Sequence, residues 1–510
     1  MRSRVIQHLF TPHSLVNRPD GFAFSLKNRI GDFQIERFLW LRVDGQMFAT
    51  DCICLDGQSA ELWSPESSLS VALGGSIEVG VSAAPLQEGS HKVEFCLQLN
   101  PYGKIKVTVQ ESPRQEQPPD RLVPRGRAEQ DYSADFISAR QELLRQKTGS
   151  EFPHIAGYSF EASRARGNIE QFIGAAQVPL GLCGPITIHG EFAQGEFYVP
   201  LATSEGTLVA SYSRGVKVLN LAGGVTCTVV QDCMQRAPVF SFENARQARD
   251  FALWVEQQRP QLAAVAEATS SVARLLEVQV FQAIRFTYLR FSFSTGDAAG
   301  QNMVGRATFA ACNWILDQYR EHPILDFFLE SNMATDKKSS GINVLHTRGK
   351  RVTAECVISN QLLQEHLRCD SATLLRHSQI AGVGGFLSQV NNTGCHSANA
   401  LAALFIATGQ DVANLAESSA GLTYCEVREN GDLYLAVTLP SLVIATHGGG
   451  TGLPTQRECL EILGCWGRDK ARKFAEIVAG VVLAGELSLA AAISSYDWVA
   501  SHERLCRHRA

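Results

Sequence analysis

The sequence lacks a surplus of charge of either sign, since its 510 residues hold 46 Lys and Arg against 51 Asp and Glu, a net charge of −5. A nucleic-acid binder needs spare cations to neutralise phosphates, so none is expected here. Long apolar runs are also missing, because Asn220, Thr226 and Glu486 interrupt or end the longest ones. These runs fall short of the roughly 20 residues of a membrane span, so we expect no membrane partner.

Metal-binding and disulfide patterns are absent as well. The 14 cysteines include no CxxC pair, and the 13 histidines form neither an HExxH motif nor a Cys/His cluster. We therefore expect buried free thiols and no metal. The amino terminus carries Arg2 and Arg4 without the apolar core of a signal peptide, so a cytoplasmic location is expected.

The composition, 45% hydrophobic and 19% charged, is that of a globular chain of about three domains. Apolar residues alternate at period two before residue 110, notably in 93–99 and 105–109 around a turn at 100–103, and Asp44-Gly45 forms a second turn. This pattern predicts a small all-β domain. Four prolines between 113 and 124 predict a linker, and the remainder reads as α+β. Within it we expect one long helical stretch over 244–276 and then a strand around 289–293.

Two segments place charged side chains where chemistry could use them. Residues 199–211 hold a single acid, Glu205, among small and apolar residues, which raises a carboxyl pKa towards that of a general acid. The alternative is a glutamate near a helix start. In 330–341, Lys337 and Lys338 follow Asp336, and a lysine held by a carboxylate can stabilise an oxyanion, unless both lysines are simply solvated.

Three further segments are loops between regular elements. Residues 295–302 contain glycines between a strand and a helix, and 448–450 are three glycines in a similar position, so both could bind a phosphate or serve as plain turns. Residues 455–458 predict a capping box that opens the next helix. Asp411 ends an Ala/Leu-rich run and could equally close a helix.

Together and in this order, these segments resemble the catalytic domain of the 3-hydroxy-3-methylglutaryl-coenzyme A (HMG-CoA) reductase family, in its class I form. The resemblance covers residues 130–510 and includes Ile173-Gly174, 179–181 and 484–489. It implies an α+β fold with a large domain and an inserted small nucleotide-binding domain. It also implies a homodimer or higher homo-oligomer with active sites between subunits, and two hydride transfers from a nicotinamide cofactor to an acyl-CoA thioester.

With the β domain added, the implied division is 1–112 for a β-sandwich-like accessory domain and 113–130 for a linker. Residues 131–241 and 330–490 form the large domain, 242–329 the small NAD(P)-binding domain, and 491–510 a carboxyl-terminal flap. The β domain has no counterpart in the typical enzyme on this interpretation, and we expect it to serve docking or assembly.

The matching motifs imply a role for each site residue. Glu205 resembles the catalytic acid, Lys337 the lysine that stabilises the oxyanion, Asp411 the carboxylate that tunes this lysine, and His502 the proton donor to the departing thiolate. Cofactor contacts are implied for Asp297, Gly300, Asn302, Gly448, Gly449, Gly450, Ser270 and Ser271. Contacts to CoA or substrate are implied for Arg214, Lys217, Asn332, Lys338, His396 and Asn399.

Departures from the family pattern concern the acyl pocket and the cofactor. The family binds the free carboxylate of its substrate with an arginine, a serine and two lysines. This chain has Ser241 for the arginine, Glu330 for the serine unless Ser331 substitutes by a one-residue shift, and Lys338 with no lysine in 372–396. Each lost charge-assisted contact costs about 1.5 to 3 kcal/mol. Ser270-Ser271 replaces a Ser-Arg pair near the cofactor's 2′-phosphate, although Arg274 could compensate, so NADPH is expected first and NADH is the alternative.

Two substrates therefore stay open. The default reaction is reduction of HMG-CoA to mevalonate, and the alternative is the same chemistry on another acyl-CoA or a carrier-protein thioester without the distal carboxylate. A non-catalytic CoA-binding relative is a third reading, against which the retention of all four catalytic residues argues.

Overall fold

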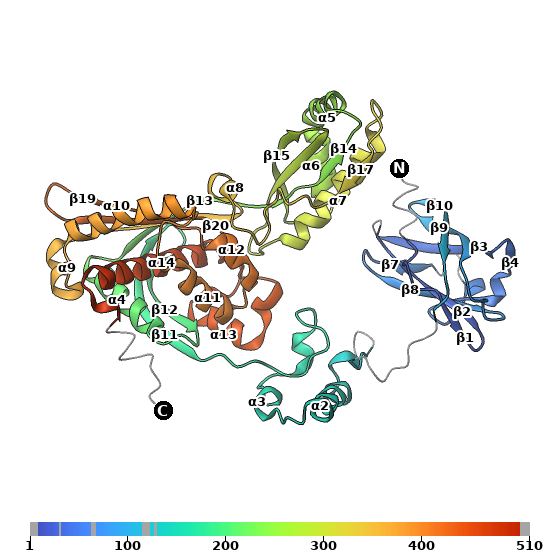
Figure 1. The fold of residues 1–510 in the computed structure, drawn as a ribbon, viewed down its shortest axis with the longest axis horizontal. Coiled ribbons are helices and arrows are strands. Elements are labelled where there is room, and N and C mark those ends of the chain that lie inside the picture. Colours follow the sequence, from blue (N-terminus) through green and yellow to red (C-terminus); the bar gives the residue numbers. More distant parts are fainter. Residues whose placement is uncertain (1–8, 30–31, 63–67, 115–122, 127–129, 500–510) are drawn as a thin grey trace. The chain divides into compact units, whose positions relative to one another are not determined.

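The computed structural model describes residues 9–29, 32–62, 68–114, 123–126 and 130–499. Two compact units are present: one combines the amino-terminal region with residues 313–319, and the other contains the rest of the chain. Figure 1 shows the helices and strands of both units. His502 and most of the predicted flap at 491–510 lie outside the described residues, as does part of the predicted linker.

The amino-terminal unit contains two five-stranded sheets around one apolar core. The first has the order β1 (Val16–Arg18), β2 (Gly21–Lys27), β8 (Ser76–Ser82), β5 (Ile53–Leu55) and β6 (Gln58–Ser59). The second has the order β10 (Gly103–Glu111), β9 (His91–Asn100), β3 (Phe33–Val43) and β4 (Gln46–Phe48), with β7 (Leu69–Val71) paired to β3. Asp44 and Gly45 both have positive φ, as a type I′ turn between β3 and β4 requires. The predicted all-β domain and both predicted turns are confirmed.

The second unit is built on a ten-stranded sheet in which β13 (Val225–Arg236) joins a larger and a smaller region. Most of β13 pairs with β18 (Gly349–Ile358), which is followed by β20 (Leu433–Leu442) and β19 (Leu422–Val427). The last residues of β13 pair with β16 (Phe286–Ser294), beside β15 (Arg274–Ala283), β14 (Val239–Ser241) and β17 (Asp326–Phe328). The hairpin of β11 (Leu180–Gly190) and β12 (Gln194–Ala202) adds to β13 through a parallel pairing of β11. The predicted α+β class is confirmed.

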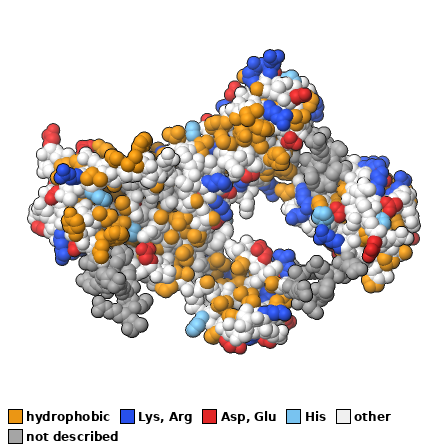
Figure 2. Space-filling model, in the orientation of Figure 1, with side chains coloured by type: hydrophobic (Ala, Val, Ile, Leu, Met, Phe, Trp, Pro, Cys, Tyr) orange, Lys and Arg blue, Asp and Glu red, His pale blue; other side chains and the backbone are white. Residues whose placement is uncertain are grey.

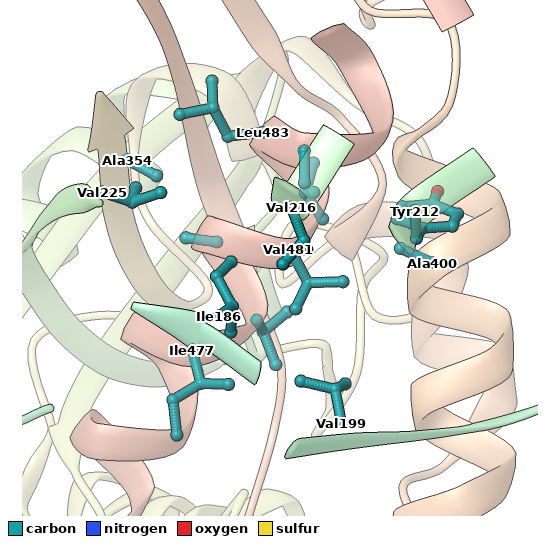
Figure 3. Close-up of a cluster of buried hydrophobic side chains, with 14 of the residues drawn as sticks. Ile186, Val199, Tyr212, Val216, Val225, Ala354, Ala400, Ile477, Val481 and Leu483 are labelled. Carbon is teal, nitrogen blue, oxygen red and sulfur yellow. The ribbon is translucent and has the colours of Figure 1, made fainter. Parts of the chain in front are cut away.

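Helix α14 (Ala471–Ser494) is the centre of the larger core and crosses α4 (Leu208–Leu221). Figure 3 shows Val481 of α14 among apolar side chains of α4 and of the β11–β12 hairpin. By length and composition α14 could cross a membrane, but 78% of its most apolar window is buried inside the protein. The helix continues through Glu486, where the apolar run ends, because the Glu486 carboxylate accepts backbone hydrogen bonds from residues 395–397.

Two predicted helix boundaries are wrong. The stretch 244–276 contains two helices, α5 (Ala245–Gln257) and α6 (Arg259–Glu267), and the start of β15. Pro260 lacks an N–H group and its fixed φ suits a first turn, so a new helix starts there. The predicted capping box at 455–458 does not form, because α13 (Pro454–Ile462) already begins at Pro454 with Leu453 as its N-cap.

Eight further α-helices complete the described part of the chain. They are α2 (Ala134–Thr148), α3 (Pro153–Ala156), α7 (Gln301–Gln318), α8 (Gly341–Leu345), α9 (Asn360–Leu367), α10 (Ser371–Ser388), α11 (Ser397–Thr408) and α12 (Leu415–Ser418). Helix α11 matters most for the site, because predicted functional residues lie at both of its ends.

Candidate active site

A cleft of about 690 Å³ brings together two loops that are far apart in the sequence. Its lining includes Gly300 and Asn302 at the start of α7, the glycine loop 448–450 after β20, and Asp411 after α11. A cleft of this size suits a nucleotide-sized ligand. The two predicted cofactor loops therefore face one cavity.

Backbone geometry explains why these loops use glycine. Gly300 has φ +82°, and a Cβ atom there would lie 2.3 Å from the Thr295 side chain. Gly448 and Gly449 also have positive φ, and a Cβ at either would enter open space, so their main chain is bare where a ligand could approach. The first N–H groups of α7 lie beside the same cleft, an arrangement that suits a phosphate.

Asp297 makes structural hydrogen bonds within the fold, and its contact with a cofactor stays a prediction. Its carboxylate accepts hydrogen bonds of 2.8 to 3.0 Å from the backbone N–H groups of residues 469–471, at the start of α14. Its carbonyl oxygen accepts from the N–H groups of Thr446 and His447, just before the glycine loop. Asp297 therefore caps α14 from a distant segment and fixes the glycine loop.

The predicted serine pair lies in the turn between α6 and β15. The Ser270 hydroxyl contacts the Met303 sulfur of α7 at 3.3 Å, so the turn adjoins the first turns of α7. Arg274 donates to the Ser271 carbonyl oxygen at 3.2 Å. Arg274 therefore lies beside the serine pair, the position it needs in order to replace the missing arginine near a cofactor 2′-phosphate.

Lys337 and Asp411 form an ion pair, with 2.8 Å between Nζ and Oδ2 and 42% of each side chain exposed. Hydrogen bonding to Asp411 is the main cause that raises the pKa of Lys337, so the ammonium stays charged. Gly409 has φ +70°, and a Cβ there would lie 2.2 Å from the Gly450 carbonyl oxygen. This glycine lets the end of α11, and hence Asp411, approach the glycine loop.

Glu205 and Asn399 form a second cluster, with the Asn399 amide nitrogen 3.3 and 3.4 Å from the two carboxylate oxygens. Glu205 is exposed, so one chain does not supply the apolar enclosure that its sequence neighbours predicted. His396, the N-cap residue of α11, is buried and stacks on Tyr212 with 4.7 Å between ring centroids. Burial lowers the pKa of His396 to about 4, so its imidazole is neutral.

Among the residues predicted to contact CoA or substrate, some side chains already bind other parts of the protein and others are exposed. Arg214 donates from Nε and Nη2 to Ser488 of α14, whereas Lys217 is exposed one turn further along α4. The Lys338 ammonium donates to the Asp336 carbonyl oxygen at 3.1 Å, and Asn332 is exposed with φ +67°. Arg214 is therefore partly engaged within the fold.

A smaller cleft, of about 320 Å³, lies beside Asn332 and contains the positions where the family pattern is broken. Ser241 donates to Asp326 at 3.0 Å, and Arg236 donates to Glu330 at 2.8 Å. The described lining residues include no lysine or arginine: they are Val239, Ser241, Phe286, Tyr288, Asp326, Phe328, Glu330, Ser331 and Asn332. The cleft offers the carboxylates of Asp326 and Glu330, and Glu330 is paired with Arg236.

The two clusters lie at opposite ends of α11. Asn399, with Glu205, is in its first turn, and Asp411, with Lys337, follows its last residue. Twelve helical residues at about 1.5 Å each span about 18 Å. The predicted acid and the predicted lysine of one chain therefore do not reach one reacting carbon.

Sequence reasoning missed the buried polar residues that support the site, among them Arg348, Glu417 and Glu486. A signal existed for Glu486, as for Glu476 of the same helix, since an acid inside a long apolar helix must find hydrogen-bond donors. Glu417 lies in the short helix α12 and has no such signature. Across the described ranges, no group of three or more His, Cys, Asp or Glu side chains is arranged to hold a metal ion.

Comparisons with known proteins identify the family of this chain. The family model described as hydroxymethylglutaryl-coenzyme A reductase matches residues 136–507. HMG-CoA reductase of Methanocaldococcus jannaschii is 41% identical over 72% of this chain and 92% of its own length, and that of Pyrococcus abyssi is 42% identical with the same coverage. The enzyme of Zea mays is 38% identical over 72% of this chain and 65% of its own. A solved class II HMG-CoA reductase from Streptococcus pneumoniae, described as bound to NADPH, has the same fold with a TM-score of 0.54 at 23% identity, covering 70% of this chain and 96% of that one.

The amino-terminal domain also has a match. A second family model, described as the amino-terminal domain of hydroxymethylglutaryl-CoA reductase, covers residues 5–113. An amino-terminal domain of this kind is therefore described for reductases, whereas the two archaeal relatives are matched over 92% of their own length by 72% of this chain. The expectation of a reductase-type oxidoreductase is confirmed, and the chain belongs to the hydroxymethylglutaryl-coenzyme A reductase family.

Proposed function

We propose that this chain reduces HMG-CoA to mevalonate with NADPH. The observation that carries the proposal is the Lys337–Asp411 ion pair at a cleft lined by glycine backbone, in a chain 41% identical to an archaeal HMG-CoA reductase. An ammonium beside a nucleotide-sized cleft is suited to an oxyanion that forms when a bound carbonyl is reduced.

The glycine loop and the start of α7 fit the phosphates of a dinucleotide, because bare backbone and helix N–H groups meet there. The bound nicotinamide supplies the hydride. NADPH takes precedence over NADH in the proposal because Arg274 lies beside Ser271, where it can pair with a 2′-phosphate.

Lys337 stabilises the negative charge on the thioester oxygen of the substrate, and Asp411 keeps Lys337 charged and directed. Glu205 supplies the proton to this oxygen, with Asn399 holding its carboxylate. His502, outside the described residues, protonates the departing CoA thiolate, whose pKa near 8.5 makes such a donor useful. When the C–S bond breaks, Glu205 takes the hydroxyl proton back as the aldehyde forms. The aldehyde carbon then accepts a second hydride, and Glu205 returns the proton to its oxygen to give the alcohol.

The proposed enzyme is a homodimer or a larger homo-oligomer, in which Glu205 and Asn399 of one copy meet Lys337 and Asp411 of another. The separation of about 18 Å along α11 supports this arrangement, because one chain alone leaves the site divided. Helix α10 supplies an apolar stripe for such a contact: Ile380, Val383, Phe386 and Leu387 are 63 to 84% exposed. Figure 2 shows hydrophobic side chains along the upper left edge, where Figure 1 has α10.

Other expectations from the sequence stay part of the proposal: the class I form, a cytoplasmic location and the division into domains at 112, 130, 241, 329 and 490.

A second substrate class, a thioester without a distal carboxylate, is favoured by one observation. The cleft beside Asn332 exposes Asp326 and Glu330, and Arg236 is already paired with Glu330. An anionic acyl end would meet carboxylates there, whereas a neutral one would not. The same catalytic residues would serve either substrate.

The test is the rate of NADPH oxidation by the purified protein with HMG-CoA, beside neutral acyl-CoAs and a carrier-protein thioester, with NADH in parallel. We expect turnover with HMG-CoA and NADPH, and none with Lys337→Ala. Turnover of a neutral thioester alone would select the second substrate class. No turnover of any thioester would overturn the proposed activity.

A further inference from the structure

We propose that Glu417 is a positioning residue for the ammonium of Lys337, acting through the Lys337 backbone. The proposal rests on the proposed function for the role of Lys337, but not for the geometry. Glu417 is fully buried on α12 and does not line the nucleotide-sized cleft. Its carboxylate nevertheless accepts a hydrogen bond from the backbone N–H of Lys337 at 3.1 Å.

The backbone of Lys337 needs such a support. Lys337 has φ +55°, in the left-handed region, and so do Thr335 and Asn332 of the same loop. None of the three is glycine, so this conformation costs free energy and persists only where the surroundings fix it. A change in the φ of Lys337 would redirect the whole side chain away from Asp411.

Arg348 makes this support rigid. Its guanidinium is fully buried and donates to Glu417 at 3.2 Å, to the Gln235 carbonyl oxygen at 3.1 Å, and to the carboxylate of Asp336. Asp336 immediately precedes Lys337 and also accepts from Gln301 of α7 at 3.0 Å. The residue before the lysine and the lysine's own N–H group are therefore both bound to one buried arginine–glutamate pair.

The same hydrogen bonds connect the loop of Lys337 to residues that line the nucleotide-sized cleft. Gln301, which holds Asp336, donates at 3.0 Å to Asn414, the last residue of the short turn that follows Asp411. Gln301 and Asn414 both line that cleft. The geometry therefore fixes Lys337 relative to the loop that carries its partner Asp411.

Glu417→Leu removes the acceptor at similar volume, and Glu417→Gln keeps an oxygen in its place. Glu476→Leu is the matched control, because Glu476 is an equally buried glutamate that accepts three backbone hydrogen bonds in the β11–β12 turn, away from the site. We expect Glu417→Leu to lower kcat about 100-fold, as a misplaced catalytic group does, with both KM values unchanged within about twofold. Glu417→Gln should recover most of this loss, and Glu476→Leu should lower thermal stability without lowering kcat of the folded enzyme.

Hydrogen exchange of the Lys337 amide tests the same geometry without any activity. We expect exchange to quicken about tenfold in Glu417→Leu, because the amide loses its acceptor, and to be unchanged in Glu476→Leu. Normal kcat and normal Lys337 protection in a folded Glu417→Leu protein would overturn the proposal. If wild-type protein reduces no thioester, the proposed function fails while the exchange result still decides the positioning role.

Discussion

Three buried glutamates organise this protein by accepting backbone hydrogen bonds. Glu476 binds the N–H groups of residues 191–193, Glu486 those of 395–397, and Glu417 that of Lys337. Burial raises the pKa of each carboxyl. Backbone N–H donors oppose that shift at Glu476 and Glu486, and at Glu417 the charge of Arg348 opposes it ahead of the N–H donor. A carboxylate in the core therefore connects segments that are distant in the sequence, two of which carry predicted site residues.

Burial of the His396 imidazole makes the free energy of unfolding depend on pH. Its pKa falls from 6.5 to about 4 on burial, so the unfolded chain binds more protons between these pH values. The contribution to stability is complete above pH 6.5 and is lost as the pH falls towards 4. The full effect is on the order of 3 kcal/mol.

Urea unfolding of wild type and His396→Gln between pH 4 and 7.5 measures this contribution. We expect the free energy of unfolding to fall more steeply below pH 6.5 in the wild type than in the variant. Parallel profiles for the two proteins would contradict a buried neutral imidazole.

At the scale of elements, the crossing of α4 and α14 determines where Arg214 and His396 lie. A Cβ at Gly215 would come within 1.9 Å of the Ala484 carbonyl oxygen, so the helices touch through backbone. Gly215→Ala must separate them, and we expect a loss of about 3 kcal/mol in the free energy of unfolding.

Gly305→Ala in α7 is the control for that substitution. A Cβ there meets only the Arg236 guanidinium at 3.9 Å, an ordinary contact. Helix propensity alone then predicts a gain of about 1 kcal/mol. Chemical denaturation measures the free energy of unfolding of both variants. Equal changes in this free energy would mean that the helix crossing has room for a methyl group.

Local patterns in the sequence predicted which segments form strands and turns better than they predicted where helices begin and end. The alternation in β9, β10 and β16 and the turn at Asp44-Gly45 are found as expected, because each depends on neighbouring residues. The capping box after Leu453 failed because Pro454 starts the helix earlier. Asp297 also binds residues 469–471, and this long-range hydrogen bonding leaves no trace in local sequence, whereas its contact with a cofactor stays a prediction.

The positions of Glu205 and Lys337 at opposite ends of α11 determine how many copies of the chain one active site needs. Glu205 and Lys337 are each placed by contacts within one chain, yet about 18 Å of helix separates their clusters. A reaction that needs both on one carbon requires a second copy. A symmetric contact would then create two identical sites, each built from both chains.

Complementation between two inactive variants tests this arrangement. Glu205→Gln and Lys337→Ala should each abolish turnover as homodimers. In a mixed dimer, one site receives both substitutions and the other receives neither, so one of two sites is complete. Random mixing makes half of the dimers mixed, and co-expression should therefore restore roughly a quarter of wild-type kcat. A site built within one chain would instead always contain one of the two substitutions, so that the mixture would stay as inactive as either parent.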